Sequence, residues 1–85
     1  MRCKIAICDD FEQDAKYIAS AVNKWAEKER ILLDVEVFPS ADSFLFHYAD
    51  HKDFDIMLLD IEMPSMSGIE LAKKIRLEND AVQII

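Results

Sequence analysis

The sequence has little of what marks a linker, a disulfide-rich scaffold or a membrane protein. It contains one glycine and two prolines in 85 residues, so no flexible linker or low-complexity segment is expected. Only two cysteines are present, and the odd spacing of Cys3 and Cys8 places them on opposite faces of a strand. We therefore expect buried free thiols. No apolar run approaches the ~20 residues that a membrane-spanning helix needs.

Basic residues are also scarce, with 10 lysines and arginines against 17 aspartates and glutamates and a net charge of −7. This balance argues against nucleic-acid binding by this segment, although a DNA-binding domain on a longer chain remains compatible with it. The N-terminus has no signal peptide, because only four apolar residues separate Lys4 from Asp9. We therefore expect a cytoplasmic chain with no membrane partner.

The hydrophobic pattern predicts one small α/β domain. Four strands are expected, at residues 4–8, 33–37, 54–60 and 81–85. Three helices are expected between them, beginning near Glu12, after Ser40 and at Gly68. The order β-α-β-α-β-α-β implies a parallel sheet with helices on both faces, with the polar-faced strand 33–37 at an edge.

The starts and faces of the helices follow from the same pattern. Asp10 and Gln13 are spaced as a capping pair for the first helix. In the last helix, the spacing of Ile69, Leu71 and Ile75 predicts that all three point inward.

Carboxylates follow two of the expected strands. Asp9 and Asp10 close the run 4–8, and Asp60 closes the run 54–60. Ligand sites in such sheets lie beyond the carboxyl ends of the strands, so the three side chains converge if these strands are neighbours. Two like charges 4 Å apart cost about 4 kcal/mol at an effective dielectric of ~20, and a proton or a hard cation such as Mg²⁺ relieves this repulsion.

Ordinary structural roles are the alternative for each residue. Asp10 alone could cap a helix and Asp60 alone could end a strand, but the two acidic sets together favour a site. Pro64 and Gly68 are interpreted as shaping the loop after Asp60, with Gly68 permitting close backbone approach.

Other catalytic patterns are weak or missing. His47 and His51 have the helical spacing of a metal site, but no third ligand accompanies them in the sequence, so an exposed helix face is favoured. We find no glycine-rich phosphate loop and no Ser-His-Asp arrangement.

Three segments carry a specific resemblance to a known family. They are Ile5–Asp10, Asp55–Pro64 and Gly68–Leu71. With these motifs the whole chain resembles the receiver domain of two-component response regulators. The resemblance implies a flavodoxin-like (CheY-like) three-layer αβα fold with strand order 2-1-3-4-5. The Cys-Asp-Asp ending of the first strand is most similar to receivers attached to LytTR-type DNA-binding domains.

The resemblance implies roles for individual residues. Asp60 would be the phospho-acceptor, and a phosphohistidine on a sensor histidine kinase would be the donor. Asp9, Asp10, the Asp60 side chain and the backbone carbonyl of Glu62 would hold Mg²⁺. The domain would be a signalling module and not an enzyme, beyond assisting its own phosphorylation and dephosphorylation, and would control an output such as transcription.

The resemblance also bears on the extent of the domain. Similar receivers carry Ser or Thr at the end of the fourth strand and Lys at the end of the fifth, and residues 1–85 reach neither position. We therefore interpret them as the N-terminal two-thirds of one receiver domain. An apolar edge at Ile84 and Ile85 and an uncovered helix face near Trp25 lead us to expect self-association of this chain.

Two alternatives remain. One is a Mg²⁺-dependent phosphohydrolase with an aspartyl nucleophile. Haloacid-dehalogenase-type enzymes, however, place Asp-x-Asp after the first strand, whereas Asp60-Ile61-Glu62 follows the third. The other is a structural interaction module that is never phosphorylated.

Overall fold

The computed structural model describes residues 2–85, which form four strands and three helices. In chain order these are β1 (Arg2–Cys8), α1 (Glu12–Glu29), β2 (Leu32–Phe38), α2 (Ala41–Tyr48), β3 (Ile56–Leu59), α3 (Gly68–Glu78) and β4 (Gln83–Ile84). All strand pairs are parallel, and the order across the sheet is β2-β1-β3-β4. The predicted parallel α/β topology and the edge position of β2 are therefore confirmed.

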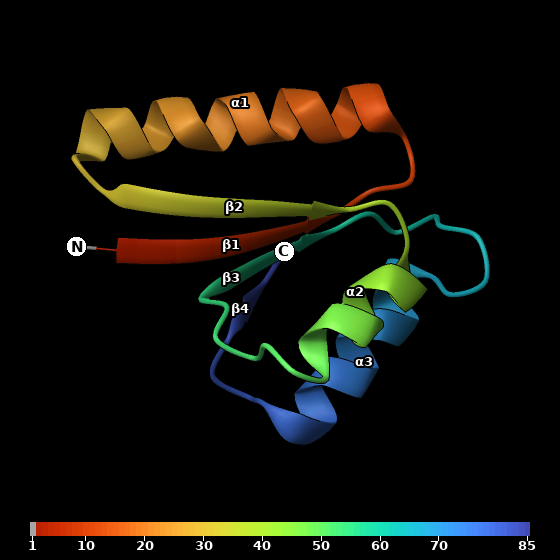
Figure 1. Cartoon of the computed structure of the whole chain (residues 1–85). Coiled ribbons are helices and arrows are strands. Elements are labelled where there is room, and N and C mark those ends of the chain that lie inside the picture. Colours follow the sequence, from red (N-terminus) through yellow and green to blue (C-terminus); the bar gives the residue numbers. More distant parts are fainter. Residues whose placement is uncertain (1) are drawn as a thin grey trace.

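The sheet forms the middle of three layers. Helix α1 covers one face, and α2 and α3 lie together on the other (Figure 1). Successive side chains of β1 alternate between these faces. Ile5 and Ile7 pack toward α1, whereas Ala6 and Cys8 belong to the core under α2 and α3. The second half of β1, residues 5–8, is apolar and buried because both of its faces are covered.

The two cysteines are free, buried and on opposite faces of β1, as predicted. Burial raises the pKa of the Cys8 thiol to about 12. Because the thiolate is the reactive form of cysteine, Cys8 is an inert core residue at neutral pH.

The helix starts agree only in part with the sequence predictions. Ser40 caps α2, accepting the Ser43 N–H at 3.0 Å in a reciprocal capping box. The predicted capping pair of Asp10 and Gln13 is wrong. Phe11 occupies the cap position of α1 without a side-chain hydrogen bond, so Asp10 lies one residue too early to cap this helix.

Three further details differ from the pattern. β3 and β4 are shorter than residues 54–60 and 81–85, although the backbone of Ile85 still hydrogen-bonds to β3. Ile69 is 55% exposed, whereas Leu71 and Ile75 are buried. Ile69 lies about 200° around the helix from Leu71, so it points away from the core.

No helix within residues 2–85 combines the length and apolar character needed to cross a bilayer.

Candidate functional site

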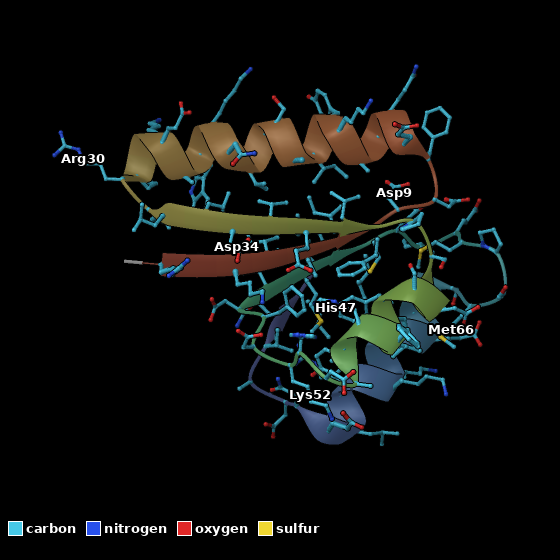
Figure 2. All side chains as sticks on the ribbon, in the orientation of Figure 1. Asp9, Arg30, Asp34, His47, Lys52 and Met66 are labelled. Carbon is cyan, nitrogen blue, oxygen red and sulfur yellow. The ribbon has the colours of Figure 1, made fainter. Side chains whose placement is uncertain are left out.

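Backbone hydrogen bonds between neighbouring strand ends position the candidate site. The Asp60 N–H donates to the carbonyl oxygen of Cys8 at 2.9 Å, which joins the ends of β3 and β1. The Asp9 N–H donates to the carbonyl oxygen of Phe38 at 3.1 Å, which joins β1 to β2. Asp9 therefore lies at the carboxyl edge of the sheet, beside the start of α1 (Figure 2).

Asp9, Asp10 and Asp60 converge at this edge. One carboxylate oxygen from each lies within 4.8 Å of the others, and in residues 2–85 this is the one cluster of three or more such ligands at that spacing. Asp9 is only 7% exposed, Asp60 is half-buried and Asp10 is exposed. The Asp9 carboxylate is held in place by the Phe11 N–H, which donates to Oδ1 at 2.9 Å.

The surroundings of Asp60 change the pKa of its carboxyl. Burial raises the pKa of this carboxyl, and the charge of Asp9 raises it further, as do the hydrogen bond and charge of Asp10. The backbone N–H of Glu62 donates to the Asp60 carboxylate and lowers the pKa in part. Taken together these effects raise the pKa of Asp60, so its ionised form is disfavoured while the cluster holds no cation.

The donor set suits a hard divalent cation. Carboxylate oxygens are the ligands that Mg²⁺ takes from proteins, and Mg²⁺ keeps several waters, so a few carboxylates on an open edge are sufficient. Asp10 and residues 61–64 line a hollow of about 550 Å³ beside the cluster, which leaves room for such waters. The structure brings the three predicted aspartates together. The backbone N–H of Glu62 binds the Asp60 carboxylate, whereas binding of a cation by the Glu62 carbonyl stays a prediction.

Gly68 and Asp60 are in close contact. A Cβ on residue 68 would overlap the carbonyl oxygen of Asp60 and lie 2.8 Å from its carbonyl carbon. The Gly68 N–H also donates to the carbonyl oxygen of Ile61 at 3.0 Å. The start of α3 therefore packs directly against the backbone of Asp60.

The loop between Asp60 and Gly68 contains a tight turn. The Met66 N–H donates to the Pro64 carbonyl oxygen at 2.8 Å, and Ser65 between them has φ 70°. This is a γ-turn, which is a strained conformation for a residue other than glycine. Pro64 thus takes part in the turn through its carbonyl as well as through its restricted φ.

Two features of the site were not predicted from the sequence. One is the Phe11 N–H that holds Asp9, an Asx-turn for which an aspartate just before a helix is a weak signal. The other is the capping box of Ser67 and Glu70, in which the Glu70 N–H donates to Ser67 Oγ at 3.2 Å. The spacing Ser-x-x-Glu is a signal for this cap and could have been found.

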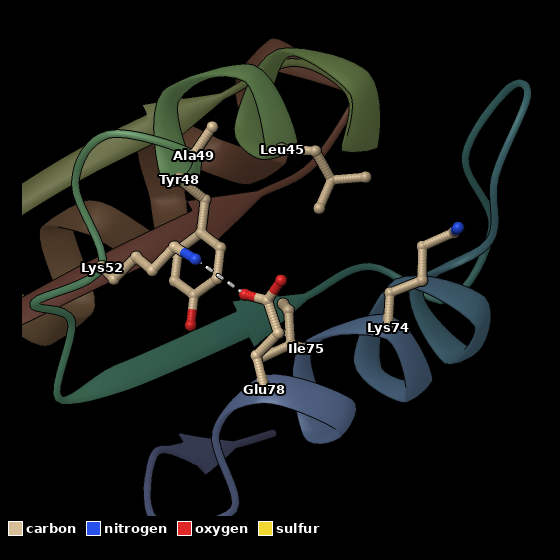
Figure 3. A pocket seen from close by; sticks show the side chains of 7 residues that line it. All are labelled: Leu45, Tyr48, Ala49, Lys52, Lys74, Ile75 and Glu78. Atoms are coloured by element: carbon tan, nitrogen blue, oxygen red, sulfur yellow. Dashed lines mark hydrogen bonds and ion pairs between the residues drawn. The ribbon is translucent and has the colours of Figure 1, made fainter.

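A separate hollow of about 220 Å³ lies between α2 and α3 (Figure 3). Lys52 Nζ reaches across it to Glu78 Oε2 at 3.0 Å. Tyr48 is among the residues that line it, and the Tyr48 hydroxyl has no exposed surface and no hydrogen-bond partner within residues 2–85. None of the three aspartates lines the hollow, and it is not part of the candidate site.

The fold and the three aspartates agree with one protein family. Residues 5–85 match the response regulator receiver domain, so the chain belongs to that family. It is therefore a signalling domain, the receiver domain of a response regulator.

Individual relatives support the same assignment. The transcriptional regulatory protein NatR of Bacillus subtilis is 36% identical over 84 residues, covering 96% of this chain and 33% of NatR. Stress response regulator protein 1 of Debaryomyces hansenii is 58% identical over 33 residues, covering 39% of this chain and 14% of that protein. The chain thus spans about a third of NatR and a smaller share of the second relative.

Solved structures confirm the predicted flavodoxin-like fold. A response regulator receiver domain protein from Clostridium thermocellum superposes with a TM-score of 0.82 at 18% identity, covering 96% of this chain and 61% of that one. The BeF3-activated DrrB receiver domain has a TM-score of 0.80 at 25% identity, covering 99% of this chain and 63% of that one. The chain therefore spans less than two thirds of either solved protein.

Proposed function

We propose that Asp60 accepts a phosphoryl group from a phosphohistidine on a sensor histidine kinase. The observation that carries this proposal is the convergence of Asp60 with Asp9 and Asp10 at the carboxyl edge of the sheet. A carboxylate oxygen of Asp60 forms a bond to phosphorus as the bond from phosphorus to the imidazole nitrogen breaks. The product is an acyl phosphate on Asp60 and a free histidine on the donor.

Mg²⁺ is the proposed cofactor of this transfer. Asp9, Asp10 and the Asp60 side chain would hold it, with the backbone carbonyl of Glu62 as a further ligand. The donor set supports this because all of these atoms are hard oxygens. When bound, the ion neutralises negative charge on the carboxylates and on the phosphoryl group. The Phe11 N–H holds the Asp9 carboxylate in position for this role.

The output of the domain is proposed to be transcription. The similarity to NatR covers 96% of this chain, and NatR is a transcriptional regulatory protein. With a net charge of −7 this segment is unsuited to bind DNA, so the contact would come from a downstream domain. We propose that residues 1–85 are the N-terminal two-thirds of the receiver, that the protein is cytoplasmic, and that its phosphorylation serves signalling and not catalytic turnover.

Phosphotransfer to the full-length protein tests the proposal. The protein is mixed with a radiolabelled phosphohistidine domain in Mg²⁺, and label on the protein is followed with time. Wild type should take up label, and chelation of Mg²⁺ should slow this. Asp60→Asn should take up none, whereas Asp80→Asn, which removes an exposed carboxylate in a turn, should behave as wild type. Equal labelling of the Asp60→Asn variant would exclude Asp60 as the acceptor.

A further inference from the structure

A groove between α1 and the edge strand β2 is largely apolar inside. It has a volume of about 530 Å³, and its apolar lining consists of Ala15, Ala19, Val37 and Pro39. Val37 lies on the same face of β2 as Val35, which packs toward α1. Because the helix residues that face it are alanines, Val37 is still 46% exposed. We call this feature the α1–β2 groove.

The rim of the α1–β2 groove is acidic. Asp9, Asp10 and Glu12 line it with three carboxylates, against the single ammonium group of Lys16. Lys16 Nζ lies 3.2 Å from Glu12 Oε1, so its charge is already used by Glu12. The rim therefore stays net negative while no divalent cation is bound. A surface that fits the groove must combine an apolar side chain with positive charge.

The outer face of α3 has this combination. Leu77 is 88% exposed, more than any other large hydrophobic residue within residues 2–85. Lys73 and Lys74 precede it by four and three residues, so the three side chains are neighbours on the helix surface. Both lysines are exposed. We call Lys73, Lys74 and Leu77 the α3 patch.

The two lysines of the α3 patch are available to bind a partner. Neither forms an ion pair within residues 2–85. The two glutamates of α3 are engaged elsewhere, Glu70 in the cap of the helix and Glu78 with Lys52 at 3.0 Å. The Lys74 side chain points away from the pair of Lys52 and Glu78 (Figure 3). Positive charge therefore surrounds the exposed leucine without a carboxylate that neutralises it.

We propose that the α3 patch of one copy of the protein docks in the α1–β2 groove of a second copy. Leu77 enters the apolar groove, and Lys73 and Lys74 face the acidic rim. The net charge of −7 makes copies repel one another on average, so contacts between like surfaces are disfavoured. Pairing the α3 patch with the acidic rim replaces this repulsion by attraction and fixes the orientation of the two copies. The contact does not depend on the proposed phosphotransfer.

The positions of the two surfaces determine the kind of assembly. Helices α1 and α3 lie on opposite faces of the sheet (Figure 1), so a groove and a patch of the same copy do not meet. One copy can offer its patch to a second copy while its groove receives the patch of a third. The contact is therefore heterologous, and association continues beyond the dimer unless a ring closes.

Sedimentation of the full-length protein in EDTA, where the rim keeps its full charge, tests the proposal. Wild type should form dimers and longer species as its concentration rises, and added salt should weaken this association. Leu77→Ser should weaken it by about tenfold or more, because that is the effect of leaving a leucine side chain unburied. Leu32→Ser is the matched control, since Leu32 is a 71% exposed leucine at the other end of β2 and should have no effect.

A mixing experiment tests whether the two surfaces are partners of each other. Val37→Lys places a positive charge in the groove and leaves the α3 patch intact, whereas Leu77→Ser disables the patch and leaves the groove intact. Each variant alone should lose the association, and an equimolar mixture should form a one-to-one complex that grows no further. Leu77 is exposed, so its substitution leaves the fold intact, and circular dichroism checks the fold of Val37→Lys.

Three outcomes would overturn the proposal. The first is a wild-type protein that stays monomeric at high micromolar concentration without divalent ions. The second is equal association of Leu77→Ser and Leu32→Ser, which would show that the α3 patch is not part of the interface. The third is a mixture of Val37→Lys and Leu77→Ser that associates no more than its components, which would show that the groove is not the partner of the patch.

Discussion

The backbone N–H of Asp60 donates a 2.9 Å hydrogen bond to the carbonyl oxygen of Cys8, so the last residues of β3 and β1 are held side by side. This backbone hydrogen bond therefore brings together the acidic residues that follow each strand, and no contact between their side chains is needed for this. A cluster of like charges is unfavourable on its own, and here the sheet backbone maintains it.

The close approach of Gly68 to Asp60 leads to a first prediction. Gly68→Ala should lower the free energy of unfolding by about 1–3 kcal/mol, because the added Cβ must displace the Asp60 carbonyl. The same shift should reduce phosphorylation of Asp60. Urea unfolding monitored by circular dichroism measures the first effect.

Lys73→Ala is the matched control, since Lys73 is exposed on the same helix and should change stability by no more than about 0.5 kcal/mol. An alanine at position 68 that leaves both stability and phosphorylation unchanged would show that α3 can move away from Asp60 at no cost.

The unequal caps of the helices give a second prediction. Ser40→Ala should lower stability by about 1 kcal/mol, because Ser40 caps α2 through the Ser43 N–H. Phe11→Ser should raise it by about 0.5–1 kcal/mol, because Phe11 occupies the cap position of α1 without a side-chain hydrogen bond. Paired denaturation curves measure both. The two substitutions should change stability in opposite directions, and a loss of stability in Phe11→Ser would indicate that the half-exposed ring packs against the protein.

The raised pKa of Asp60 gives a third prediction, on pH dependence. A carboxyl whose pKa is raised in the folded state destabilises the fold above that pKa, and the effect fades as pH falls toward the unfolded value of about 3.9. Without divalent ions, Asp60→Asn should therefore be more stable than wild type near neutral pH, and the difference should shrink in acid.

Saturating Mg²⁺ should reduce the same difference by stabilising wild type more than the variant. Unfolding curves at several pH values, with and without Mg²⁺, measure these effects. A variant less stable than wild type at neutral pH without Mg²⁺ would contradict the assigned direction of the pKa.

A fourth prediction concerns the 85-residue chain alone. Ile18, Leu58 and Ile85 line an apolar hollow of about 400 Å³ that also reaches Asp60, and Ile85 is 75% exposed. Such a surface favours association, so the chain should form dimers or larger species through β4, through α1 or by exchanging elements. Sedimentation equilibrium should show this, and Ile85→Lys should weaken it. A wild-type chain that stays monomeric at high micromolar concentration would mean that this surface is satisfied internally.

The fold was largely predictable because apolar residues recur along the sequence with the spacing of strands and helices. The apolar run in β1 and the alternation in β2 fixed both strand identity and edge position, and Ser40 marked the start of α2. The bounds of β3 and the burial of Ile69 were less predictable. They depend on which face of an element meets the sheet, and this is a tertiary property.

The candidate site was predictable to a similar degree. Asp9, Asp10 and Asp60 follow apolar runs, so their convergence follows from topology. The contact of Glu36 with His47 was not predictable, because it joins β2 to α2 and no local spacing records it. Phe11 was missed as the cap of α1 because phenylalanine is not among the residues preferred at that position.

The most direct test of the central claim is to locate the phosphoryl group. The full-length protein is incubated with acetyl phosphate and Mg²⁺, the acyl phosphate is trapped by borohydride reduction, and the modified peptide is sequenced by mass spectrometry. The modification should fall on Asp60 and on neither Asp9 nor Asp10, because Asp60 is the proposed acceptor and the other two are proposed as metal ligands. Modification of Asp9 or Asp10 in place of Asp60, or undiminished labelling of Asp60→Asn, would contradict the account.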